Sequence, residues 1–308
     1  MGRLISRFVN LLLIFSGGVA TVASAATYDN LYVFGDSNSD TGVRLMLEGI
    51  PAAPYWQGRH SNGEVAVEYL SASLGITLTP QVNTFAVGGA TTGLYNVDTN
   101  ASVYQTGMLS QFNSYSNLVG GQADPNALYF IWGGSNDISS CGKALCTQAQ
   151  LQAAVNNINL LVSDLSAEGA KNFFVVNSYG GNAGALAFNS LLAADVTSTL
   201  NTAGRNIIYF DARSVVAGMT SATNPYGFTN TSFSSPCYTG ALNGTGGTVC
   251  ANPDSYVAWD TSGHLTAHAG AILGSAMVEA VPEPETYAML LAGLGIVVTS
   301  IRRKAKRA

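Results

Sequence analysis

Apolar residues in the middle of the chain form two kinds of pattern. Five short apolar runs are bounded by Gly, Asn or Asp, as buried strands are. They cover residues 31–34, 85–87, 127–132, 173–176 and 207–210. Between the third and fourth runs, apolar residues recur at helical spacing from Leu151 to Leu165. Strands that alternate with helices predict a three-layer α/β/α sandwich around a parallel, five-stranded sheet.

Capping signals mark two helices, and a third segment is a further candidate. Thr147 and Gln150 form a capping box before one helix, and Gly169 follows it as a stop signal. A second helix is expected within residues 61–74, where a serine stands three residues before a glutamate. Residues 183–200 are the third helix candidate. The body of the chain, residues 26–281, contains no repeat and is predicted to be one domain.

The first 25 residues have the pattern of a secretory signal peptide. Arg3 and Arg7 precede an apolar run over 8–20, and the small residues 23–25 follow as an A-x-A cleavage site. We therefore expect export and removal by signal peptidase. An uncleaved membrane anchor is the alternative.

The last 27 residues, 282–308, combine three features in a fixed order. A Pro-Glu-Pro triplet at 282–284 precedes an apolar stretch over 286–301, and a basic run follows. As a helix the stretch would span about 24 Å, short for a ~30 Å hydrocarbon core. The segment resembles the PEP-CTERM sorting signal of Gram-negative bacteria. This resemblance implies a short transmembrane helix, cleavage by an exosortase, and a final periplasmic, cell-surface or extracellular location. A permanent anchor is the alternative.

Charge and composition exclude two classes of function. Residues 26–281 hold 6 basic and 16 acidic residues, a net charge of −10 with neutral histidines. Such a body repels phosphate backbones, so nucleic-acid binding is excluded. With 47% apolar and only 10% charged residues, the chain is not intrinsically disordered.

Four cysteines, an even number in a chain expected to be exported, predict disulfides. The simplest of the three pairings joins Cys141 to Cys146 and Cys237 to Cys250. No histidine stands near either pair, so neither spacing predicts a zinc site.

Ligands bind at the carboxyl ends of parallel strands, so we looked for chemistry directly after each predicted strand. Ser37 follows the first strand, in a turn that exposes backbone N–H groups. The same segment alternates Asp36, Asn38 and Asp40 as a calcium loop does, but Leu47 stands where that loop requires a glutamate. We therefore interpret the turn as one that presents a nucleophilic serine.

The next two strand ends carry groups that stabilise an oxyanion. Gly88 and Gly89 follow the second strand and allow a backbone N–H to approach a ligand. Asn136 follows the third strand, and its amide can supply another hydrogen bond. Near the end of the chain, His264 stands four residues after Asp260, which can orient its imidazole.

These segments together resemble blocks I, II, III and V of the GDSL/SGNH hydrolase superfamily. The four segments, in order, are residues 34–42, 86–92, 132–137 and 259–266, and the likeness extends over about residues 28–280. Residues 224–230, with Cys237 after them, are similar to the region before the histidine in bacterial GDSL lipases and esterases.

The resemblance implies a flavodoxin-like SGNH fold and a site made of named residues. Ser37 becomes the nucleophile, and its own N–H, Gly89 and Asn136 form the oxyanion hole, with Gly88 as the other possible donor. His264 becomes the general base and Asp260 its partner. The family spaces this last pair as D-x-x-H, whereas here it is D-x-x-x-H, which leaves the role of Asp260 open.

The expected activity is hydrolysis of carboxylic esters through an acyl-enzyme, with no metal or organic cofactor. A GDSL lipase or esterase is the first expectation. O-acetyl ester hydrolysis on an exopolysaccharide, or acyl transfer, is the alternative within the same chemistry. A non-catalytic extracellular matrix protein that retains only the fold is the alternative of another class.

Overall fold

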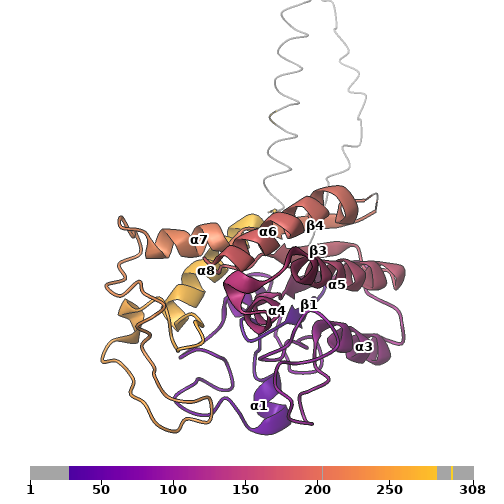
Figure 1. Ribbon diagram of the computed structural model, residues 1–308. Coiled ribbons are helices and arrows are strands. Elements are labelled where there is room, and N and C mark those ends of the chain that lie inside the picture. Colours follow the sequence, from indigo (N-terminus) through magenta and orange to yellow (C-terminus); the bar gives the residue numbers. More distant parts are fainter. Residues whose placement is uncertain (1–27, 203, 283–292, 294–308) are drawn as a thin grey trace, which may run out of the picture. The chain divides into compact units, whose positions relative to one another are not determined.

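The structure is a computed structural model, and it describes residues 28–202, 204–282 and 293. The expected signal peptide (1–25) and sorting tail (282–308) therefore lie outside the described residues, apart from Pro282 and Gly293. The described chain up to Pro282 belongs to one unit, built around a parallel sheet (Figure 1). No helix within the described part is both long and apolar enough to cross a membrane.

Four parallel strands form the sheet in the order β1-β2-β3-β4. They are β1 (Leu31–Gly35), β2 (Leu128–Trp132), β3 (Asn172–Val176) and β4 (Asn206–Phe210). The register pairs the last residue of each strand with the last residue of its neighbour. All four strands therefore end level, and the loops that follow them meet at one edge of the sheet.

The α/β class is confirmed, but the prediction of five regular strands is wrong by one. Residues 83–87 run parallel to β1 and form three ladder hydrogen bonds with it, between Val33 and Asn83, Phe85 and Val33, and Val87 and Gly35. Only Val33 and Thr84 form a bridge, so the segment is not a strand. It lies beside β1 alone, and a glycine pair ends it. Counted with the strands, it gives the flavodoxin-like order 2-1-3-4-5.

Helices cover both faces of the sheet (Figure 1). One face packs against α3 (Met108–Val119), α5 (Gln148–Ala167) and α6 (Ala183–Asp195), and the other against α2 (Ala66–Ser73), α7 (Ala212–Thr220) and α8 (Ala267–Ala280). Successive strand residues alternate between the two apolar cores, so Phe173 belongs to the first and Phe174 to the second. The shorter elements are α1 (Val43–Glu48), α4 (Ser135–Ser140), η1 (Lys143–Leu145), a π-turn η2 (Val196–Leu200) and η3 (Pro253–Ser255).

Two of the three predicted helices are confirmed, and the start of the third is wrong. Thr147 caps α5 in a capping box with Gln150, and α6 with η2 covers residues 183–200. However, α2 begins at Ala66, where the side chain of Glu68 accepts the N–H of Val65. The hydroxyl of Ser61 is not free to cap, because it donates to the carbonyl oxygen of Leu265.

Both expected disulfides are present. Cys141–Cys146 closes the turn between α4 and α5, and Cys237–Cys250 closes a longer loop between α7 and α8. The second bridge belongs to a small apolar cluster of Tyr55, Cys237, Tyr238 and Trp259. The residues of this cluster pack against one another in irregular chain, and none of them lies on a strand of the sheet.

Candidate active site

Ser37 lies two residues beyond β1, in a tight turn. Gly35 ends the strand, and a Cβ there would lie 2.5 Å from a backbone oxygen of β2, so only glycine fits. The N–H of Asn38 then donates to the carboxylate of Asp36 (3.0 Å), which curls the chain around the serine. Ser37 retains 8% of its surface exposed.

One chain of hydrogen bonds joins the predicted serine, histidine and aspartate. The Oγ of Ser37 lies 2.7 Å from Nε2 of His264, although 227 positions separate them in the sequence. The other ring nitrogen of His264, Nδ1, lies 2.6 Å from Oδ2 of Asp260. This serine–histidine–carboxylate sequence can pass a proton from a hydroxyl to an imidazole and stabilise the resulting imidazolium.

A tight hairpin brings Asp260 and His264 together despite the extra residue between them. Ala258 and Leu265 form an antiparallel bridge, which closes the hairpin at its base. At its tip, Gly263 adopts a φ of 89° and donates its N–H to the carbonyl oxygen of Asp260 (3.0 Å). A left-handed residue at this point absorbs the insertion. The D-x-x-x-H spacing therefore does not keep the carboxylate from the imidazole.

Four donors surround the buried carboxylate of Asp260. The N–H groups of Ser262 and His264 donate to Oδ1, and the hydroxyl of Tyr55 (2.8 Å) joins the ring of His264 at Oδ2. Burial alone would raise the pKa of Asp260, but the charge and hydrogen bond of His264 and the tyrosine hydroxyl hold it well below its usual value. Burial opposes a charge on His264, yet Asp260 raises the pKa of that ring above its usual value.

The expected oxyanion donors line the same cleft as the triad residues. A cleft of about 360 Å³ is lined by Ser37, Gly89, Asn136 and His264, among others. The N–H of Gly88 donates to Asp40 (2.8 Å), whereas no described residue accepts the N–H of Ser37 or of Gly89. Of the two glycines, Gly89 is thus the one with an N–H left for a ligand. The amide of Asn136 donates to the carbonyl oxygen of Ala90 (2.9 Å), beside the glycine turn.

Neither of the other two histidines forms a hydrogen bond with the serine. His60 is 3% exposed and its ring centre lies 4.9 Å from that of His264, but its nitrogens bond to no described residue. Burial, with the neighbouring His264 and Arg44, lowers the pKa of His60 well below its usual value, so this ring is neutral. His268 donates to the carbonyl oxygen of Asp254, away from the cleft.

Two tyrosines that no motif indicated support the site. Besides the bond from Tyr55 to Asp260, the hydroxyl of Tyr179 lies 3.0 Å from Oδ1 of Asn38 and 2.9 Å from the carbonyl oxygen of Gly263. Tyr179 therefore links the turn of the serine to the turn of the histidine. It lies three residues beyond β3, at the edge where chemistry is expected, so its position was a usable signal. Tyr55 lies in irregular chain, and no sequence signal marks its position.

The carboxylates that alternate after β1 are occupied by the protein itself. Asp36 binds the backbone and side chain of Asn38. Asp40 accepts backbone N–H groups from Gly42, Val43 and Gly88. Among the described residues, no group of three or more His, Cys, Asp and Glu is arranged to hold a metal ion. In this segment Asp40 and one oxygen of Asp36 thus serve to hold the turn itself.

The family model for GDSL-like lipase/acylhydrolase matches residues 31–274, which include the whole of this cleft. The chain belongs to this GDSL family. A second model, that of the PEP-CTERM protein-sorting motif, matches residues 280–304. This motif indicates export and sorting in a Gram-negative bacterium, although these residues lie almost entirely outside the described ones.

Curated relatives of this GDSL protein carry ester and acyl chemistry in their names. A phosphatidylcholine-sterol acyltransferase of Aeromonas hydrophila is 32% identical over 139 residues, 44% of this chain and 40% of its own. A GDSL esterase/lipase of Arabidopsis thaliana is 27% identical over 204 residues, 54% of this chain and 55% of its own. Lipase 1 of Photorhabdus luminescens is 30% identical over 40% of this chain and 18% of its own. The chain thus spans about half or less of these relatives.

Proposed function

We propose that this protein is a serine ester hydrolase that cleaves carboxylic esters through an acyl-enzyme on Ser37. The observation that carries the proposal is the unbroken hydrogen-bonded chain from Ser37 through His264 to Asp260. It opens into a cleft that also presents Gly89 and Asn136. Membership of the GDSL lipase/acylhydrolase family supports the same chemistry.

The first half-reaction forms the acyl-enzyme. Nε2 of His264 accepts the Ser37 proton as Oγ attacks the ester carbonyl carbon, and Asp260 stabilises the imidazolium. The N–H groups of Ser37 and Gly89 and the Asn136 amide donate to the oxyanion. The carbon–oxygen bond to the alcohol then breaks, and His264 returns the proton to the leaving alcohol. In the second half-reaction, water replaces Ser37 as the nucleophile by the same steps.

Replacement of the nucleophile tests the proposal. In Ser37→Ala we expect kcat on a short-chain nitrophenyl ester to fall by about 10⁴-fold or more. Labelling by a fluorophosphonate probe should be lost as well. Ser140→Ala, an exposed serine on α4 outside the cleft, is the matched control and should retain both. Full activity or full labelling of Ser37→Ala would refute the assignment. A wild-type protein that never labels would instead favour a matrix protein without activity.

A second candidate substrate, an O-acetylated polysaccharide, is favoured by the lining beside the cleft. A hollow of about 460 Å³ shares Ser135, Tyr179 and Thr261 with the catalytic cleft. Hydroxyl side chains, glycine backbone and Asn182 make up most of its wall, and the half-buried rings of Tyr179 and Phe233 complete its aromatic part. Such a wall suits a polyhydroxylated alcohol better than an acyl chain.

A substrate panel distinguishes the candidates. Nitrophenyl esters of increasing chain length, a phospholipid and an acetylated polysaccharide should be assayed with wild type and Ser37→Ala. A preference for long chains identifies a lipase, and acetate release from the polymer identifies the second candidate. Because one relative is named an acyltransferase, an added acceptor alcohol tests transfer in the same assay.

The ends of the chain define the proposed location. We infer export through the signal peptide at 1–25, followed by cleavage near Pro282 by an exosortase, as the sorting motif supports. The intact mass of the mature product tests both steps. A product without either end is expected, whereas one that retains residues 286–308 would identify a permanent anchor.

A further inference from the structure

The proposed oxyanion donor Gly89 lies in a turn whose central peptide can take two orientations. The N–H of Ala90 donates to the carbonyl oxygen of Val87 (3.0 Å), so Gly88 and Gly89 are the central residues of a β-turn. The φ of 87° at Gly89 is typical of a type II turn. Type I and type II turns differ in which way the peptide between the central residues faces.

That peptide couples the carbonyl of Gly88 to the N–H of Gly89. A trans peptide is planar, so its C=O and N–H point in opposite directions. Whatever holds the Gly88 oxygen on one side therefore directs the Gly89 N–H to the other. If the peptide turned over, an oxygen atom would face the site of the N–H.

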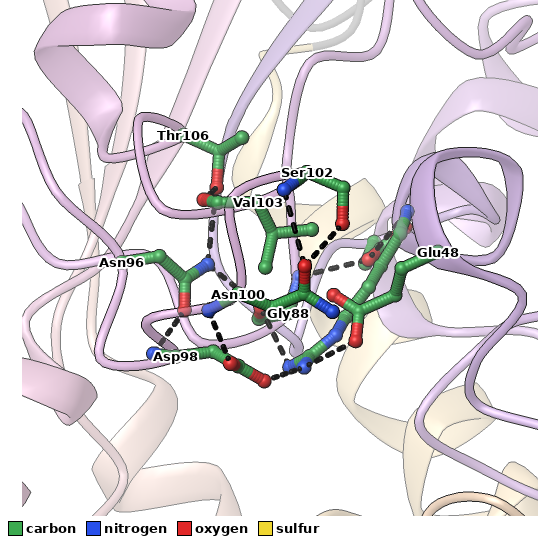
Figure 2. A network of polar contacts seen from close by, with 10 residues as sticks. Glu48, Gly88, Asn96, Asp98, Asn100, Ser102, Val103 and Thr106 are labelled. Atoms are coloured by element: carbon green, nitrogen blue, oxygen red, sulfur yellow. Dashed lines mark hydrogen bonds and ion pairs between the residues drawn. The ribbon is translucent and has the colours of Figure 1, made fainter.

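Two side chains hold the Gly88 oxygen. Nη1 of Arg44 donates to it at 3.0 Å, and Nδ2 of Asn96 donates to it at 3.0 Å (Figure 2). Neither residue belongs to the segment 83–87 that precedes the turn: Arg44 lies on α1, and Asn96 lies in the loop after the turn. The contacts thus fix the peptide from outside its own segment.

Arg44 and Asn96 are themselves fixed. Arg44 is 4% exposed, and its guanidinium pairs with the carboxylates of Glu48 (3.2 Å) and Asp98 (Figure 2). A buried charge is stable only when it is paired in this way. Asn96 is 4% exposed, and its Oδ1 accepts the N–H of Asp98 while its Nδ2 also donates to Thr106. Both donors therefore have little freedom to leave the Gly88 oxygen.

We propose that Arg44 and Asn96 are positioning residues, which hold the Gly88–Gly89 peptide so that the Gly89 N–H faces the cleft. The inference rests on the proposed function only in treating this N–H as an oxyanion donor. It assigns control over the orientation of the oxyanion hole to an ion-paired arginine and a buried amide, neither of which belongs to the triad.

Asn96→Asp tests the inference. The variant keeps the size and the Oδ1 acceptor, but it places a carboxylate oxygen where a donor now faces the Gly88 oxygen. Repulsion should turn the peptide, and the loss of one donor should lower kcat by about 10²-fold. Because the oxyanion exists only in the transition state, KM should change by no more than about twofold. The inhibition constant of a trifluoromethyl ketone, which forms such an oxyanion on the serine, should rise by the factor lost in kcat.

Asn100→Asp is the matched control. It makes the same substitution and adds the same charge in the same loop, at an exposed residue whose Oδ1 accepts from Ser102 and which does not contact Gly88. It should retain the wild-type kcat. The inference is overturned if the kcat of Asn96→Asp stays within about twofold of that of this control, or if only KM changes.

Arg44→Lys tests the second residue that bonds to the Gly88 oxygen. It keeps the positive charge that pairs with Glu48 and Asp98. A lysine lacks the planar fork needed to serve a carbonyl and two carboxylates together, so kcat should fall by about tenfold, again without a matching change in KM. An unchanged kcat would remove Arg44 from the proposal.

The two proposals fail in different ways. If the wild type has no Ser37-dependent activity, the proposed function fails, and crystal structures of Asn96→Asp and Asn100→Asp then decide the inference. A Gly88–Gly89 peptide that is turned over in the first and unchanged in the second supports it. An unchanged peptide in both overturns it.

Discussion

The two halves of the site reach the cleft by different routes. Ser37, Gly89 and Asn136 form the strand half, because each follows a strand or the segment that runs along β1. Asp260 and His264 form the hairpin half, on irregular chain between α7 and α8. The residues of the strand half follow segments that are hydrogen-bonded into the sheet. Neither residue of the hairpin half follows a strand of the sheet.

The halves also differ in what holds them. Main-chain hydrogen bonds along β1 and its neighbours support the strand half, and Arg44 and Asn96 bond to the Gly88 oxygen beside it. Main-chain hydrogen bonds also close the hairpin, but side chains join it to the rest of the site. Tyr55 bonds to Asp260, Tyr179 bonds at Gly263, and the Cys237–Cys250 disulfide closes the loop that contributes to the neighbouring aromatic cluster. We therefore expect single side-chain substitutions to disturb the hairpin half more widely than the strand half.

Among variants that leave the nucleophile in place, Asp260→Asn should have the largest effect. An amide nitrogen at the position of Oδ2 would present hydrogens to Nδ1 of His264 and favour the wrong tautomer, so kcat should fall by about 10⁴-fold. Asp254→Asn makes the same change at an exposed residue of the preceding segment and should have little effect. Steady-state kinetics of the two variants decide the matter. A loss below about tenfold would show that the carboxylate does not orient the imidazole.

In the strand half, Asn136→Ala should have the next largest effect. One donor to the oxyanion is removed while the serine, histidine and aspartate remain paired, so kcat should fall by about 10²–10³-fold. Labelling by a fluorophosphonate should persist at a lower rate. Asn113→Ala, on the exposed side of α3, is the control. If both alanine variants have equal kcat, Asn136 is not a donor.

Removal of the Cys237–Cys250 disulfide tests the support of the hairpin half. The bridge closes 13 residues, so Cys237→Ser/Cys250→Ser should lose about 3 kcal/mol of unfolding free energy. The Cys141–Cys146 bridge closes 5 residues, and its double serine variant should lose about 2 kcal/mol. Urea unfolding measures both. The first variant should also lose activity at lower urea than the second, and the reverse order would contradict the comparison.

The pH dependence of the wild type follows from the imidazole. Since Asp260 raises the pKa of His264, and only the neutral ring accepts the serine proton, activity should decline as pH falls through a value above about 6.5. Below that point kcat/KM should fall about tenfold per pH unit. A pH profile of kcat/KM measures the midpoint. A midpoint below 6 would contradict a charge-stabilised imidazolium.

The smallest expected effect is that of Tyr55→Phe. Oδ2 of Asp260 keeps its bond to His264 but loses the tyrosine hydroxyl, so kcat/KM should fall by about threefold to tenfold. The pKa of His264 should rise slightly, because the carboxylate then bonds more strongly to the imidazolium. The direction of this pKa shift is measured as the shift of the acidic midpoint in the pH profile of kcat/KM. Tyr226→Phe, at an exposed tyrosine, is the control. A downward shift would contradict this account.

The strand half could be predicted from the sequence because its signals are local. A short apolar run ended by Gly35, Asp36 and Ser37 defines both a strand and the residue that follows it. The same logic reached Gly89 and Asn136. The apolar run at 85–87 was mistaken for a regular strand, because an edge segment with ladder hydrogen bonds on one side has the same composition as a strand.

The hairpin half and the supports of the site could be predicted only in part. The candidate pair of Asp260 and His264 was found, but the turn at Gly263 that joins them depends on a backbone angle that the spacing does not specify. Tyr55 and Arg44 act over 205 and 44 positions of sequence, and no periodic pattern marks such contacts. The start of α2 was misplaced for the same reason, since Ser61 bonds to Leu265 rather than to its own helix.

Two of the three proposed oxyanion donors are main-chain groups, at Ser37 and Gly89. Apart from substitution by proline, exchange of a side chain does not delete a main-chain N–H; it can only turn the peptide that carries it. Evolution or engineering could therefore tune this electrostatic contribution gradually through a residue such as Asn96, which is not part of the cleft lining. The serine and the imidazole, in contrast, are either present or lost.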